Sequence, residues 1–158
     1  MGNSVPVEVS SLVDRPDFID ACAAWTYGRW GIGSTRTLES TLERFRQAAS
    51  DSVMPLTFVA HVNDRPIGMA SLFEDDCELR PDLRPWLAAV FVHPDHRANG
   101  VAGLLIQAVE QAARRLGEEM IYLTTTDSQN LYTSHGWQHA GIVQYPDCDL
   151  YLMHKPLT

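Results

Sequence analysis

The alternation of apolar and polar residues predicts most of the strands of this chain. Residues 57–62 and 67–73 (TFVAHV and IGMASLF) are short apolar runs on either side of the turn sequence NDRP, a pattern typical of two strands joined by a turn. Residues 86–92 (WLAAVFV) are apolar throughout, as expected for a strand buried on both faces. Further strands are predicted at residues 5–9, 120–126, 140–145 and 149–154.

The clearest helical pattern begins just after residue 100. Apolar residues recur there at helical spacing until Gly117 ends the pattern, at Val101, Leu104, Leu105, Ala108, Val109, Ala112 and Leu116. Residues 14–47 are also helical in pattern, but the stretch YGRWGIGST (27–35) divides them into two helices, the second from about residue 34 to about residue 50. A short helix is predicted within residues 129–137, ended by Gly136.

The order of these elements predicts the fold class. Strand, long helix and strand over residues 86–126 form a βαβ unit with a right-handed crossover, while the other strands follow one another through short turns. We therefore predict one α/β domain with a mixed, mostly antiparallel sheet, a central parallel pair and flanking helices. With 158 residues, of which 45% are hydrophobic, the chain can bury a core of its own.

Composition narrows the classes of partner. The formal net charge is −8 and no basic stripe is present, which argues against nucleic acid and anionic membrane surfaces and fits a cationic small molecule. Three scattered cysteines indicate neither a disulfide framework nor a zinc site, and we expect no metal. Without a signal-peptide pattern or a long apolar run, a cytoplasmic location is expected, and a homodimer stays open.

The stretch HRANGVAGLL (96–105) joins the apolar strand to the long helix. Gly100, Ala102 and Gly103 carry little or no side chain, and the first backbone N–H groups of a helix have no internal partner. Such a helix start binds anions, and Arg97 can add a cation at its rim. The alternative is a tight turn that binds nothing. The stretch matches neither the P-loop pattern nor G-x-G-x-x-G.

This part of the chain resembles a known family. VFVHPDHRANGVAGLL resembles the acetyl-CoA-binding motif of the GCN5-related N-acetyltransferases (GNAT), in which V-x-P precedes Q/R-x-x-G-x-G/A, and Arg97, Gly100 and Ala102 fill that pattern. LYTSHGW (131–137) resembles the family's Y-x-x-x-G-F/W segment, and the element order also agrees. The resemblance covers nearly the whole chain and implies a single acetyl-CoA-binding N-acetyltransferase domain over residues 1–158.

The resemblance also implies a cofactor site. In the family the central strand separates from its parallel neighbour, and the pantetheine arm of acetyl-CoA lies in the gap. The backbone of Phe91 and Val92 would pair with that arm as with an added strand. The pyrophosphate would lie on Arg97, Ala98, Asn99, Gly100, Val101, Ala102 and Gly103.

By the same resemblance Tyr132 lies near the thioester sulfur. A phenol can protonate a leaving thiolate because their reference pKa values lie within about two units. The alternative is that Tyr132 is an aromatic packed beside Trp137. An oxyanion formed during the transfer could receive a hydrogen bond from a strand N–H at a bulge.

The group expected to take the proton from the acceptor amine, the general base, differs from the family pattern. Several members carry a glutamate where this chain has Trp86, and the strand at 86–92 has no carboxylate. We expect Glu74, in the acidic run after residue 73, to take the amine proton directly or through water. The alternative is that this run, with Asp75, Asp76 and Glu78, is only solvated surface.

The acceptor site is expected under the loop between the first two helices, which often covers the acceptor in this family. Tyr27 and Trp30 would contact the acceptor, with Asp75 and Trp86. The resemblance implies acetyl transfer to a primary amine, here of a small molecule, by direct attack on the thioester. The alternatives are acetylation of a protein N-terminus or lysine, a non-catalytic CoA-binding or sensing module, and a plain structural domain.

Overall fold

The strands of the protein form one mixed sheet. The computed structural model describes residues 6–50 and 52–158, and the seven strands follow the order β1-β2-β3-β4-β5-β7-β6 across the sheet. Their bounds are β1 (Glu8–Ser11), β2 (Leu56–Val62), β3 (Arg65–Phe73), β4 (Trp86–Val92), β5 (Met120–Thr125), β6 (Gln138–Gln144) and β7 (Asp149–Pro156). Of the predicted first strand, Val5 lies outside the described residues.

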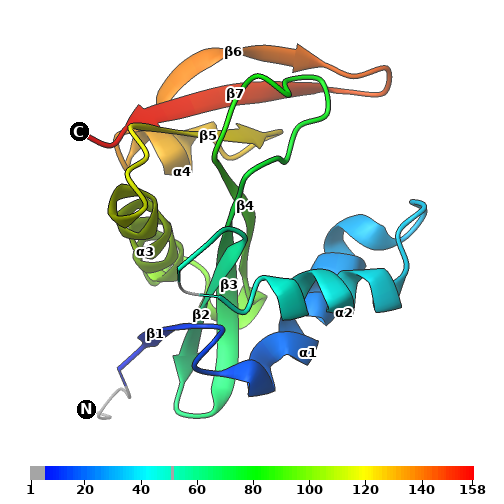
Figure 1. The fold of residues 1–158 in the computed structure, drawn as a ribbon, viewed down its shortest axis with the longest axis vertical. Coiled ribbons are helices and arrows are strands. Elements are labelled where there is room, and N and C mark those ends of the chain that lie inside the picture. Colours follow the sequence, from blue (N-terminus) through cyan, green and yellow to red (C-terminus); the bar gives the residue numbers. More distant parts are fainter. Residues whose placement is uncertain (1–5, 51) are drawn as a thin grey trace.

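Every neighbouring pair of strands is antiparallel except β4 and β5, which are parallel. These two meet at a single residue pair, Trp86 with Tyr122, and then diverge toward their C-terminal ends, as Figure 1 shows. The predicted fold class, a mostly antiparallel sheet with a central parallel pair, is therefore confirmed, and the pair is splayed as the family resemblance implied.

Trp86 closes the sheet where β4 and β5 begin. Its ring is fully buried, lies 5.7 Å from that of Tyr122, and its Nε1 donates a hydrogen bond to the Leu83 carbonyl at 2.8 Å. Because its indole N–H is satisfied and its ring is enclosed, Trp86 serves the core. The expectation that it contacts the acceptor is wrong.

Helices cover both faces of the sheet. Helix α3 (Val101–Arg115) lies on one face, while α1 (Ile19–Thr26) and α2 (Leu38–Gln47) lie on the other (Figure 1). Short α4 (Gln129–Thr133) follows β5, and single turns occur at Pro16–Phe18, Tyr27–Gly31 and Pro94–His96. No helix within the described ranges is long and apolar enough to cross a membrane.

The connection between α1 and α2 differs from its sequence pattern. Residues Tyr27–Gly31 form a π-helical turn that continues α1, instead of an open loop. Helix α2 starts at Leu38, because Thr37 and Ser40 exchange hydrogen bonds in a capping box that satisfies the first N–H groups. The predicted start near residue 34 is therefore wrong by about one helical turn.

Strand β4 changes character midway. Its first three residues are buried and the last four are only half-buried, so burial on both faces holds for the first half alone. The register with β3 shifts between Met69 and Ser71, and Ala89 has a left-handed φ of 54°. This β-bulge bends the strand away from β5 where the gap opens.

A buried ion pair ties the far part of the sheet to α3. Glu110 is almost fully enclosed in α3, and Lys155 of β7 donates to its carboxylate at 2.5 Å. The same ammonium donates to the carbonyl of His135, just after α4, at 2.7 Å. Lys155 therefore fixes β7 and the end of α4 against α3, on one side of the gap.

Candidate active site

Two adjoining cavities occupy the gap between β4 and β5. One, here the acceptor cavity, has a volume of about 520 Å³ and is lined by residues from α1, α2, β3, β4 and the end of β5. The other, the cofactor cavity, measures about 760 Å³ and is lined by the last residues of β4 and the start of α3. The residues lining both cavities are Arg29, Val90, Asp127, Ser128 and Tyr132.

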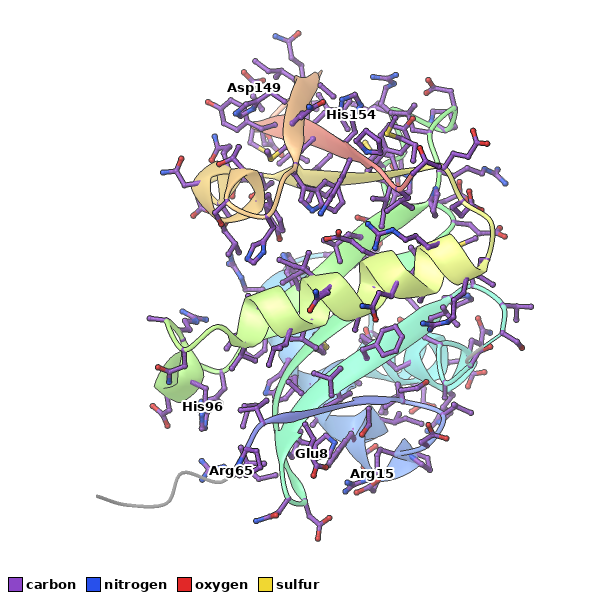
Figure 2. The ribbon with its side chains drawn as sticks, turned by 90° about the vertical axis from the view of Figure 1, so that its left-hand side faces the viewer. Glu8, Arg15, Arg65, His96, Asp149 and His154 are labelled. Carbon is purple, nitrogen blue, oxygen red and sulfur yellow. The ribbon has the colours of Figure 1, made fainter. Side chains whose placement is uncertain are left out.

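The start of α3 presents backbone donors to the cofactor cavity. Gly100 precedes the helix with a φ of 79°, and no side chain in the described part of the protein caps this end. The carbonyl of Gly100 accepts from the N–H of Leu104 at 3.2 Å, which leaves the earlier N–H groups without a helical partner. The helix start therefore fits an anionic group of a ligand. Figure 2 labels His96 in the turn that leads into this helix.

Most of the expected pyrophosphate-binding residues line this cavity. Asn99 is exposed and is not among the lining residues. Arg97 is anchored, because its Nε donates to the Val92 carbonyl at 3.0 Å, and its other guanidinium N–H groups remain for a ligand. A Cβ on Gly103 would lie 2.8 Å from the His135 ring, so this glycine is needed for packing as well as for close approach.

The register of β4 decides which backbone groups face the gap. His93 donates to the Ile67 carbonyl at 2.8 Å, and Phe91 is paired with Met69 of β3. Since N–H and C=O directions alternate along a strand, the Phe91 groups point to β3 and those of Val92 point to the gap. Val90 shares the direction of Val92. The two residues whose backbone groups face the gap are therefore Val90 and Val92, instead of the expected Phe91 and Val92. The Phe91 ring stacks on that of Trp25 at 5.0 Å.

Tyr132 lies where the two cavities meet. Its residue is only 7% exposed and its ring lies edge-on to Trp137 at 6.1 Å. Burial raises the pKa of the Tyr132 phenol to about 12, so the hydroxyl keeps its proton at neutral pH. Tyr132 therefore packs against Trp137 and also lies at the junction of the two cavities.

The acidic run after β3 contributes one carboxylate to the acceptor cavity, and this is Asp76. Glu74 is exposed and lines neither cavity, and Asp75 lies 4.0 Å from the Arg84 guanidinium outside the cavities. The candidate base therefore moves from Glu74 to Asp76, and Asp75 is not placed to bind an acceptor.

Asp76 is solvent-exposed, as Glu74 is, but it differs from Glu74 in lining the cavity, where the surrounding protein reduces its solvation. This loss of solvation raises its pKa to about 6, while the positive charges of Arg44 and Arg36 act in the opposite direction. A carboxyl group with such a pKa changes its charge close to neutral pH. It can therefore take up and release a proton under ordinary conditions.

The aromatic residues of the first connection have separate roles. Trp30 lines the acceptor cavity and is 41% exposed. Tyr27 is half-buried, lies outside both linings, and packs closely over Gly31, where a Cβ would collide with its ring. Only Trp30 is therefore available to an acceptor.

Sequence reasoning missed the residues that follow β5. Asp127 and Ser128 line both cavities, and the Ser128 hydroxyl donates to the Asp127 carboxylate at 3.2 Å. The signal was their place directly after the second parallel strand, because the carboxyl ends of parallel strands share the edge where ligands bind. The arginines of the acceptor cavity, Arg29, Arg36 and Arg44, were also missed.

Solved acetyltransferases share this fold. Aminoglycoside 6'-N-acetyltransferase complexed with coenzyme A aligns with a TM-score of 0.76 at 14% identity, over 96% of this chain and 97% of that one. A Salmonella typhimurium protein with its cofactor acetyl-CoA aligns with a TM-score of 0.75 at 16% identity, over 99% and 95%.

Sequence comparison gives the family. The amino-acid acetyltransferase of Pasteurella multocida (strain Pm70) is 34% identical over 61 residues, which is 39% of this chain but only 14% of that protein. The model of the Acetyltransferase (GNAT) family matches residues 20–137. With this match and a sheet that is splayed at its parallel pair, the chain belongs to the Acetyltransferase (GNAT) family.

Proposed function

We propose that the protein transfers the acetyl group of acetyl-CoA to the primary amine of a small molecule, within one acetyl-CoA-binding domain over residues 1–158. The observation that carries the proposal is the meeting of the two cavities at Tyr132. One cavity offers the uncapped start of α3, and the other offers a carboxylate with a pKa near neutrality. An anionic cofactor and an amine would thus meet at one phenol.

The cofactor cavity fits the parts of coenzyme A. Its pyrophosphate suits the N–H groups at the start of α3 and the guanidinium of Arg97. The amides of the pantetheine arm suit the backbone groups of Val90 and the N–H of Val92, while the Val92 carbonyl already accepts from Arg97. Structural neighbours solved with coenzyme A or acetyl-CoA support this assignment.

Acetyl-CoA supplies the acetyl thioester, and the protein supplies the proton transfers. Asp76 takes the proton of the acceptor ammonium, directly or through one water, so that the amine can attack. A backbone N–H at the bulge beside Ala89 donates a hydrogen bond to the thioester oxygen as negative charge develops on it.

Tyr132 donates its hydroxyl proton to the sulfur as the bond to the acetyl carbon breaks. The apolar surroundings that raise the pKa of this phenol also raise that of a thiol formed beside it, so the two groups stay matched.

The acceptor cavity supports a small molecule over a protein chain. Its volume of about 520 Å³ falls within the usual range for small-ligand sites. A relative in part of the chain is an amino-acid acetyltransferase, which agrees with an acceptor of this size.

The test is acceptor-dependent release of free thiol from acetyl-CoA by the purified protein, with small amines, lysine peptides and peptide N-termini as acceptors. Tyr132→Phe should lower kcat about 100-fold with little change in cofactor affinity, because it removes only the hydroxyl. Thermal stabilisation by acetyl-CoA without thiol release from any acceptor would indicate a binding module instead.

A further inference from the structure

The acceptor cavity is lined by three arginines although the chain carries a formal net charge of −8. They are Arg29, Arg36 and Arg44. Within the described ranges, the arginines that form ion pairs with carboxylates are others: Arg15, Arg46, Arg80, Arg84 and Arg114. The cavity therefore holds guanidinium groups whose charge is not matched by a bonded carboxylate.

Aromatic rings support two of these guanidinium groups. The Arg44 guanidinium carbon lies 4.2 Å from the centre of the Phe73 ring, and that of Arg29 lies 5.7 Å from the Trp30 ring. A guanidinium packed over a ring keeps its N–H edge free, and this edge matches the two oxygens of a carboxylate or phosphate. The rings thus hold the arginines ready for an anion.

The charges of the lining do not cancel. Burial is the main cause that lowers the pKa of the Arg44 guanidinium; the charge of Asp76 acts against it, and the charge of Arg36 adds a smaller lowering effect. Three arginines nevertheless line the cavity. The carboxylates in the lining are Asp76 and Asp127. If Asp76 receives the acceptor ammonium, the arginines remain for a group of the opposite charge.

We propose that the acceptor amine carries its own acidic group, a carboxylate or a phosphate, which Arg36 and Arg44 bind while Asp76 receives the ammonium. This inference rests on the proposed function and names its substrate class, the amino acids and related zwitterionic amines. It replaces the purely cationic partner that the overall charge suggested. An amine without an acidic group would add its positive charge to those of the arginines and would offer them no anion. The site therefore disfavours such an acceptor.

Matched acceptors test the inference on the wild-type protein. The common L-amino acids are compared with their carboxamides, and phosphoethanolamine is compared with ethanolamine, by thiol release from acetyl-CoA. Loss of the acidic group should lower kcat/KM at least about 100-fold, since the paired hydrogen bonds from Arg36 and Arg44 would have no acceptor oxygens. The two series also distinguish a carboxylate from a phosphate.

Variants test the assignment to particular arginines. Arg36→Gln and Arg44→Met, the latter keeping the contact with the Phe73 ring, should lower kcat/KM for acidic acceptors at least about tenfold more than kcat/KM for the amides, which reports any indirect effect on Asp76. Arg65→Gln is the matched control, because Arg65 is exposed in β3 and lines neither cavity. Figure 2 shows Arg65 at the opposite end of the molecule from Asp149 and His154.

The outcomes separate the two proposals. Equal kcat/KM for acids and their neutral analogues, or equal losses with both acceptor types in the arginine variants, would overturn the acidic acceptor and leave the transferase standing. Thiol release with none of the acceptors would overturn the transferase and the acidic acceptor together.

Discussion

At the scale of single residues, Asp76 gives the proposed chemistry its pH dependence. Loss of solvation raises the pKa of this carboxyl to about 6, and a base acts only when deprotonated. In the wild-type protein kcat/KM should therefore fall as the pH decreases through about 6, beyond the loss caused by protonation of the acceptor amine. Asp76→Asn should lower kcat/KM and remove this extra fall, as measured by pH profiles of thiol release.

Variants of the neighbouring carboxylates test whether the fall in kcat/KM near pH 6 arises from Asp76. Glu74→Gln and Asp75→Asn should keep the wild-type profile, because both side chains lie outside the cavities. If the fall in kcat/KM at low pH disappears in Asp127→Asn but persists in Asp76→Asn, the base is Asp127. Unaltered profiles in all variants would mean that solvent takes the proton.

The sequence could name the acidic run but not the acid that lines the cavity. Glu74, Asp75 and Asp76 follow β3 immediately, where the alternation of strand faces no longer fixes direction. The sequence showed that Trp86 stands where several family members carry a glutamate. It could not show that the Trp86 ring packs against Tyr122, which lies on a separate strand. Residue roles of this kind arise from tertiary packing, which local pattern does not contain.

At the scale of elements, the start of α3 combines a structural and a binding role. A glutamate in the first turn of a helix is favourable for the helix itself but repels a bound phosphate. Ala102→Glu should therefore fold normally and weaken acetyl-CoA binding at least about tenfold relative to the neutral isostere Ala102→Gln, as measured by calorimetry. Equal affinities in the two variants would contradict the assignment of the pyrophosphate to this helix start.

Elements with a sustained period were predicted well, and connections were not. Strand β4 begins and ends where its apolar run does, and α3 follows its helical spacing to within two residues of Gly117. Residues 27–37 could not be predicted in detail, because a π-helical turn and a capping box depend on a few local hydrogen bonds. Most of the fold therefore follows from the pattern, whereas the wall of the acceptor cavity does not.

At the scale of the whole molecule, one ion pair helps to join the two parts of the splayed sheet. Lys155→Met removes the partner of buried Glu110 and leaves the Arg114 guanidinium, which lies 3.9 Å from that carboxylate. The free energy of unfolding should fall by about 3 kcal/mol, measured by urea denaturation. The double variant Glu110→Leu/Lys155→Met should recover most of this loss, because no unpaired charge stays buried. A small loss in the single variant would show that Arg114 replaces the lysine.

Bound acetyl-CoA should protect particular backbone amides beside the gap in the sheet, and the register of β4 decides which ones. The backbone groups of Val90 and Val92 face the gap, while those of Phe91 are already bonded to β3. Acetyl-CoA should therefore slow amide hydrogen exchange at Val92 and in the first turn of α3 strongly, and at Phe91 only weakly, measured residue by residue by NMR.

The same experiment contains its own control. A ligand that merely stabilises the whole fold by mass action slows exchange most at amides that open only by global unfolding, such as those of β2 and β3. Local bonding instead protects the edge of β4 that lacks a strand partner. Protection spread evenly over β2, β3 and β4, with no excess at Val92, would mean that acetyl-CoA binds without pairing with this strand. Excess protection at Val92 together with the start of α3 would place the pantetheine arm and the pyrophosphate along one continuous path to Tyr132.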